Sequence, residues 1–169
     1  MSKFLGLAAA ALSLAAASPA LADAPAPNPF TGLRVGLEVG VVSDQAFGTD
    51  KATYGATVGY DLQVAPSVVL GPVVGFTGLF QDEGTSVREL SAGARLGVRV
   101  ASRTLVYGVA SYSNLDADGV SSVDGYKLGL GVEQKLGRRV YAHVETRYAD
   151  YQHLGDGLYQ TVVGVSYRF

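Results

Sequence analysis

Two residues of the chain have the types and the spacing for acid–base or hydrolytic chemistry. His143 and Glu145 are two positions apart, and side chains with that spacing lie on the same face of a β-strand. An imidazole beside a carboxylate can act as a general base, but hydrolysis also needs a nucleophile within its reach. We find no nucleophile paired with a base, and the second histidine, His153, falls in an expected loop. We therefore predict that the protein is not an enzyme and that His143 belongs to a structural polar network.

Acidic residues gather in the segments that we expect to form loops, where metal binding is the chemistry to consider. The order Asp-Ala-Asp-Gly at residues 116–119 is similar to the start of a calcium-binding loop, but the bidentate Glu further along such a loop is missing. The absence of Cys excludes a thiolate metal site. We predict no metal site, no cofactor and a solvated acidic surface, with divalent ions bridging carboxylates to lipopolysaccharide phosphates as a looser hypothesis. The loop residues concerned are Asp44, Asp50, Asp82, Glu83, Asp116, Asp118, Asp150 and Asp156, against Lys51 and Arg88.

The composition is that of a folded chain with less charge than most soluble domains. Of the 169 residues, 48% are hydrophobic and 17% are charged, and the net charge is −2, whereas about 25% charged residues is typical of soluble domains. The apolar content excludes a disordered chain. The nearly balanced charge gives no electrostatic footprint for nucleic acid, which we do not expect as a partner.

The first 32 residues precede the expected fold. Residues 1–22 combine one positive charge, Lys3, with an apolar run rich in Ala and Leu that ends in a small-residue cleavage pattern. This is the pattern of a cleaved secretory signal peptide, and the run is short for a transmembrane helix. In residues 23–32, Pro recurs at every second position from residue 25 to residue 29. This spacing predicts an extended, Pro-rich periplasmic linker.

From residue 33 onward, apolar residues alternate with polar residues or Gly, which predicts strands with two different faces. Five runs alternate clearly and three are less regular, so we expect eight strands. Most of them are near the roughly 9 to 11 residues that a tilted membrane strand requires. The runs cover residues 33–41, 54–62, 68–78, 90–100, 105–112, 125–133, 140–148 and 159–169.

Short and long connections alternate between these runs. The short ones are residues 63–66, 101–103 and 137–139, and the longer ones are residues 43–52, 79–89, 114–124 and 149–158. Outer-membrane barrels have short periplasmic turns and longer external loops in this order. We predict an all-β fold, an eight-stranded antiparallel up-and-down transmembrane β-barrel over residues 33–169, with both termini on the periplasmic side.

Alternation alone does not say whether the apolar face meets lipid or fills the core of a soluble, lipocalin-like periplasmic binder. The polar face favours the membrane barrel. It is rich in Gly, which leaves room in a narrow lumen, and its charges have both signs, as an enclosed face requires. Asp61 and Arg168 share this face. We predict a structural network of interior charges that plugs the lumen, made of Arg34, Glu38, Arg95, Lys127, Glu133, Glu145 and Arg147.

The aromatic residues favour the same orientation. Trp is absent, and Tyr and Phe fall near both ends of the apolar strand faces, where amphipathic rings meet lipid headgroups. The external girdle is predicted to contain Tyr54, Phe76, Tyr126, Tyr148 and Tyr159. The periplasmic girdle is predicted to contain Tyr60, Tyr107, Tyr167 and Phe169.

Residues 54–62 (YGATVGYDL), 144–151 (VETRYADY) and 163–169 (VGVSYRF) resemble segments of the small eight-stranded outer-membrane β-barrels. This family includes opacity-like porin family proteins and the transmembrane domain of outer membrane protein A. Phe169, with Tyr167 two positions earlier, is similar to the signal that the outer-membrane assembly machinery recognises. The resemblance implies an integral protein of the Gram-negative outer membrane, with lipid, lipopolysaccharide and the assembly machinery as partners. Because the sequence ends at Phe169, we expect no peptidoglycan-binding domain of the kind found in full-length outer membrane protein A.

The resemblance leaves several functions to weigh. We expect a non-enzymatic role in envelope structure and in surface interaction through the acidic external loops, with the surface ligand open. A small porin-like diffusion channel is the alternative, although side chains are expected to fill a lumen of eight strands. Some barrels of this size are lipid A deacylases with a His, a Ser and a Glu. A lipid A-modifying enzyme is less expected here, because the position of Glu145 would have to hold the Ser and its face points away from lipid.

Overall fold

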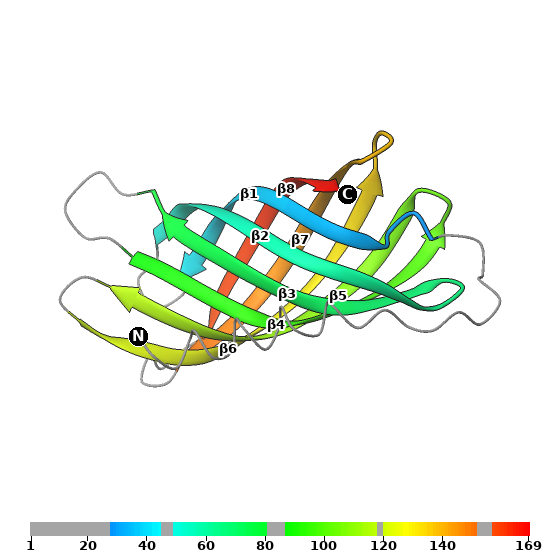
Figure 1. Cartoon of the computed structure of the whole chain (residues 1–169). Helices are drawn as coiled ribbons and strands as arrows, with labels where there is room; N and C mark the ends of the chain where they lie inside the picture. Colours follow the sequence, from blue (N-terminus) through cyan, green and yellow to red (C-terminus); the bar gives the residue numbers. More distant parts are fainter. Residues whose placement is uncertain (1–27, 45–48, 81–86, 118–119, 152–156) are drawn as a thin grey trace.

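The computed structural model describes residues 28–44, 49–80, 87–117, 120–151 and 157–169. Within them, eight antiparallel strands close into a barrel in which each strand pairs with its neighbours in sequence and β1 pairs with β8 (Figure 1). The predicted all-β up-and-down barrel is therefore confirmed. The strands are β1 (Gly32–Asp44), β2 (Thr49–Ala65), β3 (Val68–Leu79), β4 (Val87–Ala101), β5 (Thr104–Ala117), β6 (Val120–Lys135), β7 (Val140–Tyr151) and β8 (Leu158–Arg168). No helix in the described part of the chain is long and apolar enough to cross a membrane.

The three short turns and both described ends of the chain lie at one end of the barrel, which we call the turn end. The turns are residues 66–67, 102–103 and 136–139, and they gather on the right in Figure 1. The opposite end, where the longer connections begin, is the loop end. The expected signal peptide, residues 1–22, and residues 23–27 of the expected linker lie outside the described residues.

The strands are longer than the alternation predicts. The longest, β2, has 17 residues, and the β5–β6 ladder continues to the pair Ala117 and Val120, where we expected a loop over residues 114–124. Apolar alternation stops where a strand leaves the lipid, but ladder hydrogen bonds need only backbone groups, which polar residues also provide. As a result, several charged residues expected in loops lie in paired strands instead: Asp44, Asp50, Lys51, Arg88, Asp116 and Asp150.

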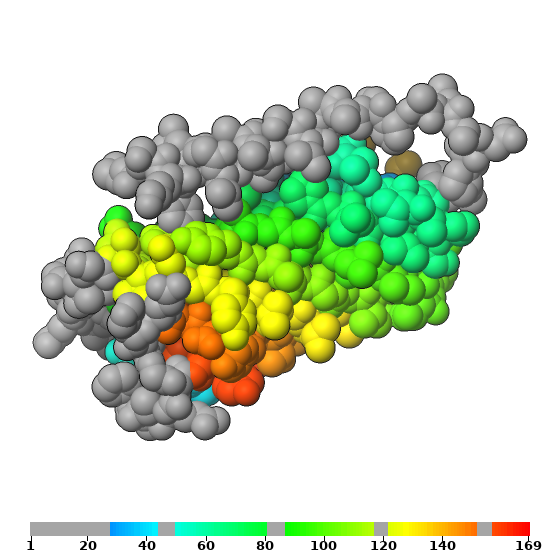
Figure 2. All heavy atoms as spheres, turned by 90° about the horizontal axis from the view of Figure 1, so that it is seen from below, coloured from blue at the N-terminus to red at the C-terminus, as the bar shows by residue number. Residues whose placement is uncertain are grey.

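The apolar face points outward and the charged face points inward. Leu37 and Leu130 are 69% and 74% exposed on the outside, whereas Arg95 and Glu133 are 1% exposed inside. The described side chains of β4 to β7 form a continuous outer wall in the space-filling view of Figure 2. This is the arrangement of a membrane barrel and the reverse of a lipocalin-like soluble barrel.

Tyr107 corrects the predicted periplasmic girdle, because its ring lies inside the barrel and is 4% exposed. Strand β5 is apolar on both faces near its start, so its alternation is ambiguous. The register places Leu105 and Tyr107 inside together with Ser113, while Val106 and Tyr112 face outward. Since a shift of one residue reverses every side chain, the buried polar residue at the far end of the strand marks the inner face.

Candidate functional site

The lumen is the candidate site, and the ion pairs nearest the turn end centre on Asp61. Arg95 Nη1 and Arg168 Nη2 each lie 2.8 Å from Asp61 Oδ2, and Arg34 Nε lies 3.7 Å from the same oxygen. Glu133 accepts from Arg95 at 2.6 Å and from Arg168 at 2.8 Å. These five residues, the Asp61 cluster, come from β1, β2, β4, β6 and β8. The cluster therefore ties the wall of the barrel together across the lumen.

A second cluster lies further from the turn end, around Glu38. Arg147 donates to both carboxylate oxygens of Glu38, at 2.5 and 2.7 Å, and its Nε donates to Glu145 at 2.5 Å. Tyr107 Oη donates to the other oxygen of Glu145 at 2.8 Å, and His143 Nε2 lies 3.6 Å from Glu38 Oε2. Such bidentate, charge-assisted bonds are among the strongest in proteins. We call these five residues the Glu38 cluster.

The Tyr107 ring connects these two clusters. The guanidinium carbon of Arg95 lies 3.8 Å from the centroid of this ring, a cation–π contact between a buried cation and an aromatic face. The inward position of Tyr107 thus gives its ring and its hydroxyl separate partners, Arg95 and Glu145.

A third group of contacts lies toward the loop end. Lys127 forms an ion pair with Glu89. Ser113 Oγ donates to Glu89 Oε1 at 2.8 Å and lies 3.0 Å from Tyr151 Oη. We call these four residues the Lys127 cluster. Polar contacts thus continue through the lumen toward the loop end.

The chain before β1 closes the turn end from inside. Phe30 is fully buried, with its ring centroid 5.5 Å from that of Tyr141. Arg168 Nη1 donates to the Phe30 carbonyl at 2.5 Å, and Tyr141 Oη donates to the Pro29 carbonyl. This N-terminal plug, residues 28–31, corrects the expectation of an extended linker through residue 32. Gly32, with a φ of 100°, turns the chain from the plug into β1.

Two inward-facing glycines leave the space that the Glu38 cluster occupies. A Cβ atom at Gly129 would lie 2.6 Å from Glu145 Oε1, and one at Gly131 would lie 2.5 Å from the Tyr107 ring. Both distances are far shorter than van der Waals contact. Glycine is therefore the residue that lets these side chains approach the wall of β6.

The side chains leave a cavity of about 40 Å³ inside the lumen, lined by Arg34, Glu38, Arg95, Tyr107, Lys127 and His143 among others. A cavity of this size has room for a few ordered waters, which polar walls can bind. The side chains around it are held by ion pairs and hydrogen bonds on several strands. The lumen is packed rather than open along its length.

Every residue of the predicted interior network is buried in the lumen. Arg34, Arg95 and Glu133 belong to the Asp61 cluster, Glu38, Glu145 and Arg147 to the Glu38 cluster, and Lys127 to the third cluster. The prediction omitted Asp61 and Arg168, although the alternation had placed both on the inner face. It also omitted Glu89, which was expected in a loop. The longer strand β4 brings Glu89 into the lumen.

The outer surface carries aromatic contacts near both ends. At the loop end, the Tyr148 and Tyr159 ring centroids are 5.1 Å apart. At the turn end, those of Tyr167 and Phe169 are 4.9 Å apart, and both residues are exposed. The other residues of the two predicted girdles lie on the outer face and are half-buried or exposed: Tyr54, Tyr60, Phe76 and Tyr126.

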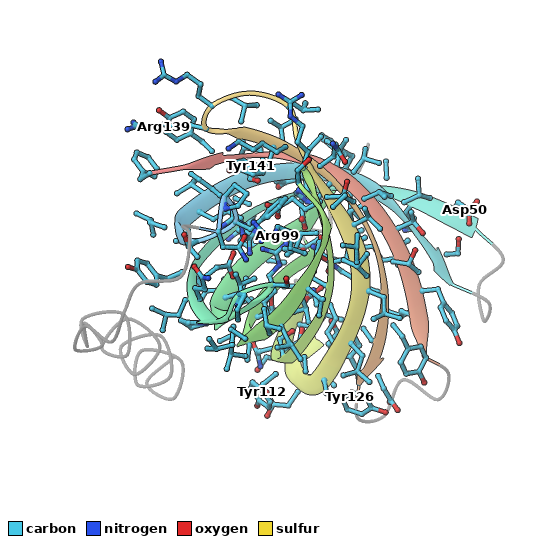
Figure 3. All side chains as sticks on the ribbon, turned by 90° about the vertical axis from the view of Figure 1, so that its right-hand side faces the viewer. Asp50, Arg99, Tyr112, Tyr126, Arg139 and Tyr141 are labelled. Carbon is cyan, nitrogen blue, oxygen red and sulfur yellow. The ribbon has the colours of Figure 1, made fainter. Side chains whose placement is uncertain are left out.

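Some described acidic residues of the loop end accept hydrogen bonds from polar neighbours. Tyr126 Oη donates to Asp150 at 3.1 Å, and Asn114 Nδ2 donates to Asp124 at 2.7 Å. Figure 3 labels Tyr112 and Tyr126, which project from the outside of the barrel, and Asp50 near the start of β2. Among the described residues, no three His, Asp or Glu side chains are grouped as metal ligands. Asp82, Glu83, Asp118, Asp156, His153 and the side chain of Asp44 lie outside the described part.

Comparison with known proteins points to the outer-membrane β-barrels. The family profile of the outer membrane protein beta-barrel domain matches residues 7–169. The structure is similar to that of Ail, the attachment invasion locus protein of Yersinia pestis, with a TM-score of 0.58 and 12% identity over 82% of this chain and 97% of that one. It is also similar to that of Neisserial surface protein A, with a TM-score of 0.57 and 14% identity over 81% of this chain and 96% of that one. The N-terminal barrel domain of Pseudomonas aeruginosa OprF is similar as well, with a TM-score of 0.55 and 16% identity over 82% of this chain and 99% of that domain. No curated protein sequence matches the chain.

Proposed function

The chain belongs to the outer membrane protein β-barrel family, and from this premise we propose a non-enzymatic role in envelope structure and in surface interaction at the loop end. Because the short turns of outer-membrane barrels are periplasmic, the turn end faces the periplasm and the loop end faces outward. The packed lumen is the observation that carries the proposal. Side chains from most strands pair across it, which leaves the ends and the outer surface for contact with other molecules.

The loop end supports interaction with a cationic surface. Its described strand ends expose Asp50, Asp116 and Asp124, and also the two cations Lys51 and Arg88, of which Arg88 lies opposite Asp116 in the β4–β5 ladder. The connecting segments add the acidic residues Asp82, Glu83, Asp118 and Asp156 and contain no Lys or Arg. Ail has been solved with the heparin analogue sucrose octasulfate, an anion that this acidic end would repel.

A diffusion channel is the second candidate, and the cavity of about 40 Å³ is the observation that favours it. Conduction would require ions to pass the Asp61 cluster and the N-terminal plug, both of which are held by buried bonds. We therefore expect no conductance steps from protein inserted in a planar bilayer. Repeated steps of uniform size would favour the channel instead.

The positions of His143 and Glu145 give less support to hydrolysis of lipid A than to a structural role. His143 lies beside Glu38 inside the barrel, and Glu145 is bonded to Arg147 and Tyr107. A lipid substrate would meet the outside of the wall. We expect the mass of lipid A to be unchanged when the protein is overproduced.

Surface interaction is tested with proteoliposomes on polylysine-coated and heparin-coated surfaces. We expect binding to polylysine that weakens with salt, because surface charges act over about one Debye length. Any binding to heparin should depend instead on the cations Arg138 and Arg139 of the turn end. The triple variant Asp116→Asn/Asp124→Asn/Asp150→Asn should bind less polylysine. The variant Arg138→Gln/Arg139→Gln, changed at the turn end, serves as the control and should bind polylysine as the wild type does. Binding that is unaffected by the triple variant would remove the support for an acidic recognition surface.

The turn end of β8 supports a further proposal about assembly. Tyr167 and Phe169 pack against each other and are exposed on the outer surface, where another protein can reach them. We propose that they are the signal read by the outer-membrane assembly machinery. Phe169→Ala should therefore slow insertion into the outer membrane, measured as heat-shifted protein in the membrane fraction.

A further inference from the structure

The exposed surface of the turn end is basic. The three turns and the residues that flank them, 64–67, 101–104 and 134–140, contain no Asp or Glu. Asp61 and Glu133, the acidic residues of the adjoining strand segments, are buried in the lumen and paired there. The exposed or half-exposed cations at this end, which we call the basic rim, are Arg99, Arg103, Lys135, Arg138 and Arg139.

The basic rim extends over two neighbouring hairpins. Lys135 N donates to the Arg103 carbonyl at 2.8 Å, so the β6–β7 hairpin meets the β4–β5 hairpin at this end. Arg99 bonds to the Pro66 carbonyl at 3.3 Å, and Lys135 Nζ lies 5.9 Å from the Tyr141 ring centroid, which places both over the mouth. Arg139 lies instead on the outside of the β6–β7 turn (Figure 3).

Arg139 is held at the level of the aromatic girdle. Its Nη1 donates to Tyr167 Oη at 3.3 Å, and Tyr167 packs against Phe169 on the outer face. Tyr residues of such girdles sit among lipid headgroups. The guanidinium of Arg139 therefore lies at the depth of lipid phosphates, with apolar rings beside it for acyl chains. Arg138 adds a second exposed cation next to it.

We propose that Arg138 and Arg139 bind the phosphate of an anionic phospholipid in the periplasmic leaflet, with the rest of the basic rim adding attraction. A guanidinium matches the oxygens of a phosphate with two donors, and basic clusters at a membrane surface attract anionic lipids. This inference concerns the opposite end of the barrel from the proposed surface interaction and does not depend on it. Lipid is favoured over carboxylates of the cell wall because the bond to Tyr167 holds Arg139 at the lipid-facing surface.

The lipid proposal is tested by native mass spectrometry. The folded protein is released from nanodiscs that contain equal amounts of phosphatidylglycerol and phosphatidylcholine, and the lipids that stay bound to it are identified. We expect the wild type to retain the anionic lipid in about tenfold excess over the zwitterionic one. In Arg138→Gln/Arg139→Gln the excess should fall severalfold, to the smaller excess that Arg99, Arg103 and Lys135 of the basic rim maintain. Lys51→Gln/Arg88→Gln removes two cations at the loop end and should keep the wild-type excess. A boiled and unboiled gel comparison confirms that every variant is folded.

Three results would overturn the proposal. The first is the same lipid excess in the wild type and in the Arg138→Gln/Arg139→Gln variant. The second is an equal loss in the loop-end control, which would show that total charge and not this site is responsible. The third is binding to isolated peptidoglycan that depends on Arg138 and Arg139 while lipid retention does not, which would assign the rim to the cell wall.

Discussion

The carboxylate of Asp61 balances several buried cations, so its removal should be costly. It is fully buried, and the side chains of Arg34, Arg95 and Arg168 lie within 3.7 Å of one of its oxygens. Asp61→Asn keeps the shape of the side chain but leaves Glu133 as the only carboxylate of the cluster. Breaking a buried ion pair by removing one partner costs about 3–5 kcal/mol. We expect the free energy of unfolding to fall by that amount.

The assay is a urea titration of protein folded in lipid vesicles. The folded fraction is read from the difference in gel migration between unboiled and boiled samples, because the chain has no Trp for fluorescence. A closed barrel resists detergent until it is heated, since all its strand edges are paired. Linear extrapolation then gives the free energy of unfolding. Asp50→Asn, at an exposed carboxylate bonded to Ser43 at 2.8 Å, is the matched control and should lose about 1 kcal/mol or less.

A second variant separates charge balance from other effects of the substitution. Arg34 is the most distant of the three cations from Asp61, at 3.7 Å. The double variant Asp61→Asn/Arg34→Gln removes one charge of each sign and should be more stable than Asp61→Asn alone by about 1–2 kcal/mol. Our reasoning is refuted if Asp61→Asn costs no more than Asp50→Asn, or if the double variant loses the sum of the two single losses.

Three other changes test the plug, the Glu38 cluster and the glycine spacing, each by the same unfolding assay. Phe30→Ala empties a fully buried site and should cost about 3 kcal/mol; a change below about 1 kcal/mol would show that the plug is not part of the stable fold. Tyr107→Phe keeps the ring but removes the 2.8 Å bond to Glu145, for an expected loss of about 1–3 kcal/mol, and unchanged stability would argue against that bond. Gly129→Ala places a methyl group 2.6 Å from Glu145 Oε1 and should cost about 1–3 kcal/mol. Gly108→Ala, where the nearest atom is 3.6 Å away, should have little effect, and equal losses in the two glycine variants would contradict the packing argument.

The strand order and most of the inner and outer faces could be predicted because they depend on local alternation. A strand between lipid and a polar lumen must change polarity at every residue, and β8 and β2 do so with few exceptions. Tyr107 was misplaced because β5 carries apolar residues on both faces at its turn end. Where both faces are apolar, alternation does not define the register.

The pairing inside the lumen could not be predicted in the same way. Most residues that meet there are distant in sequence: Arg147 bonds to Glu38 across 109 positions, and Arg168 bonds to the Phe30 carbonyl across 138. Which side chains meet depends on the tilt and stagger of the closed barrel, which a single strand does not reveal. Asp61 was recognised as inward-facing, but its place between three cations follows only from the closed geometry. The plug was missed because alternating Pro gives no sign of the buried contacts of Phe30.

The charges that are not enclosed lie at the two ends: the turns of the turn end are basic, and the loop end has more acidic residues than the two cations Lys51 and Arg88. Inside, the cations of the clusters are matched by carboxylates, because an unpaired charge in an enclosed lumen is costly. At the ends water is available, so no such constraint applies, yet the turn end carries Arg138 and Arg139 without an acidic neighbour in the turns while the loop end exposes Asp116 and Asp124. Membrane insertion does not by itself require this asymmetry. We therefore propose that the end charges serve recognition, of lipid phosphates at the periplasmic end and of cationic surfaces at the external end.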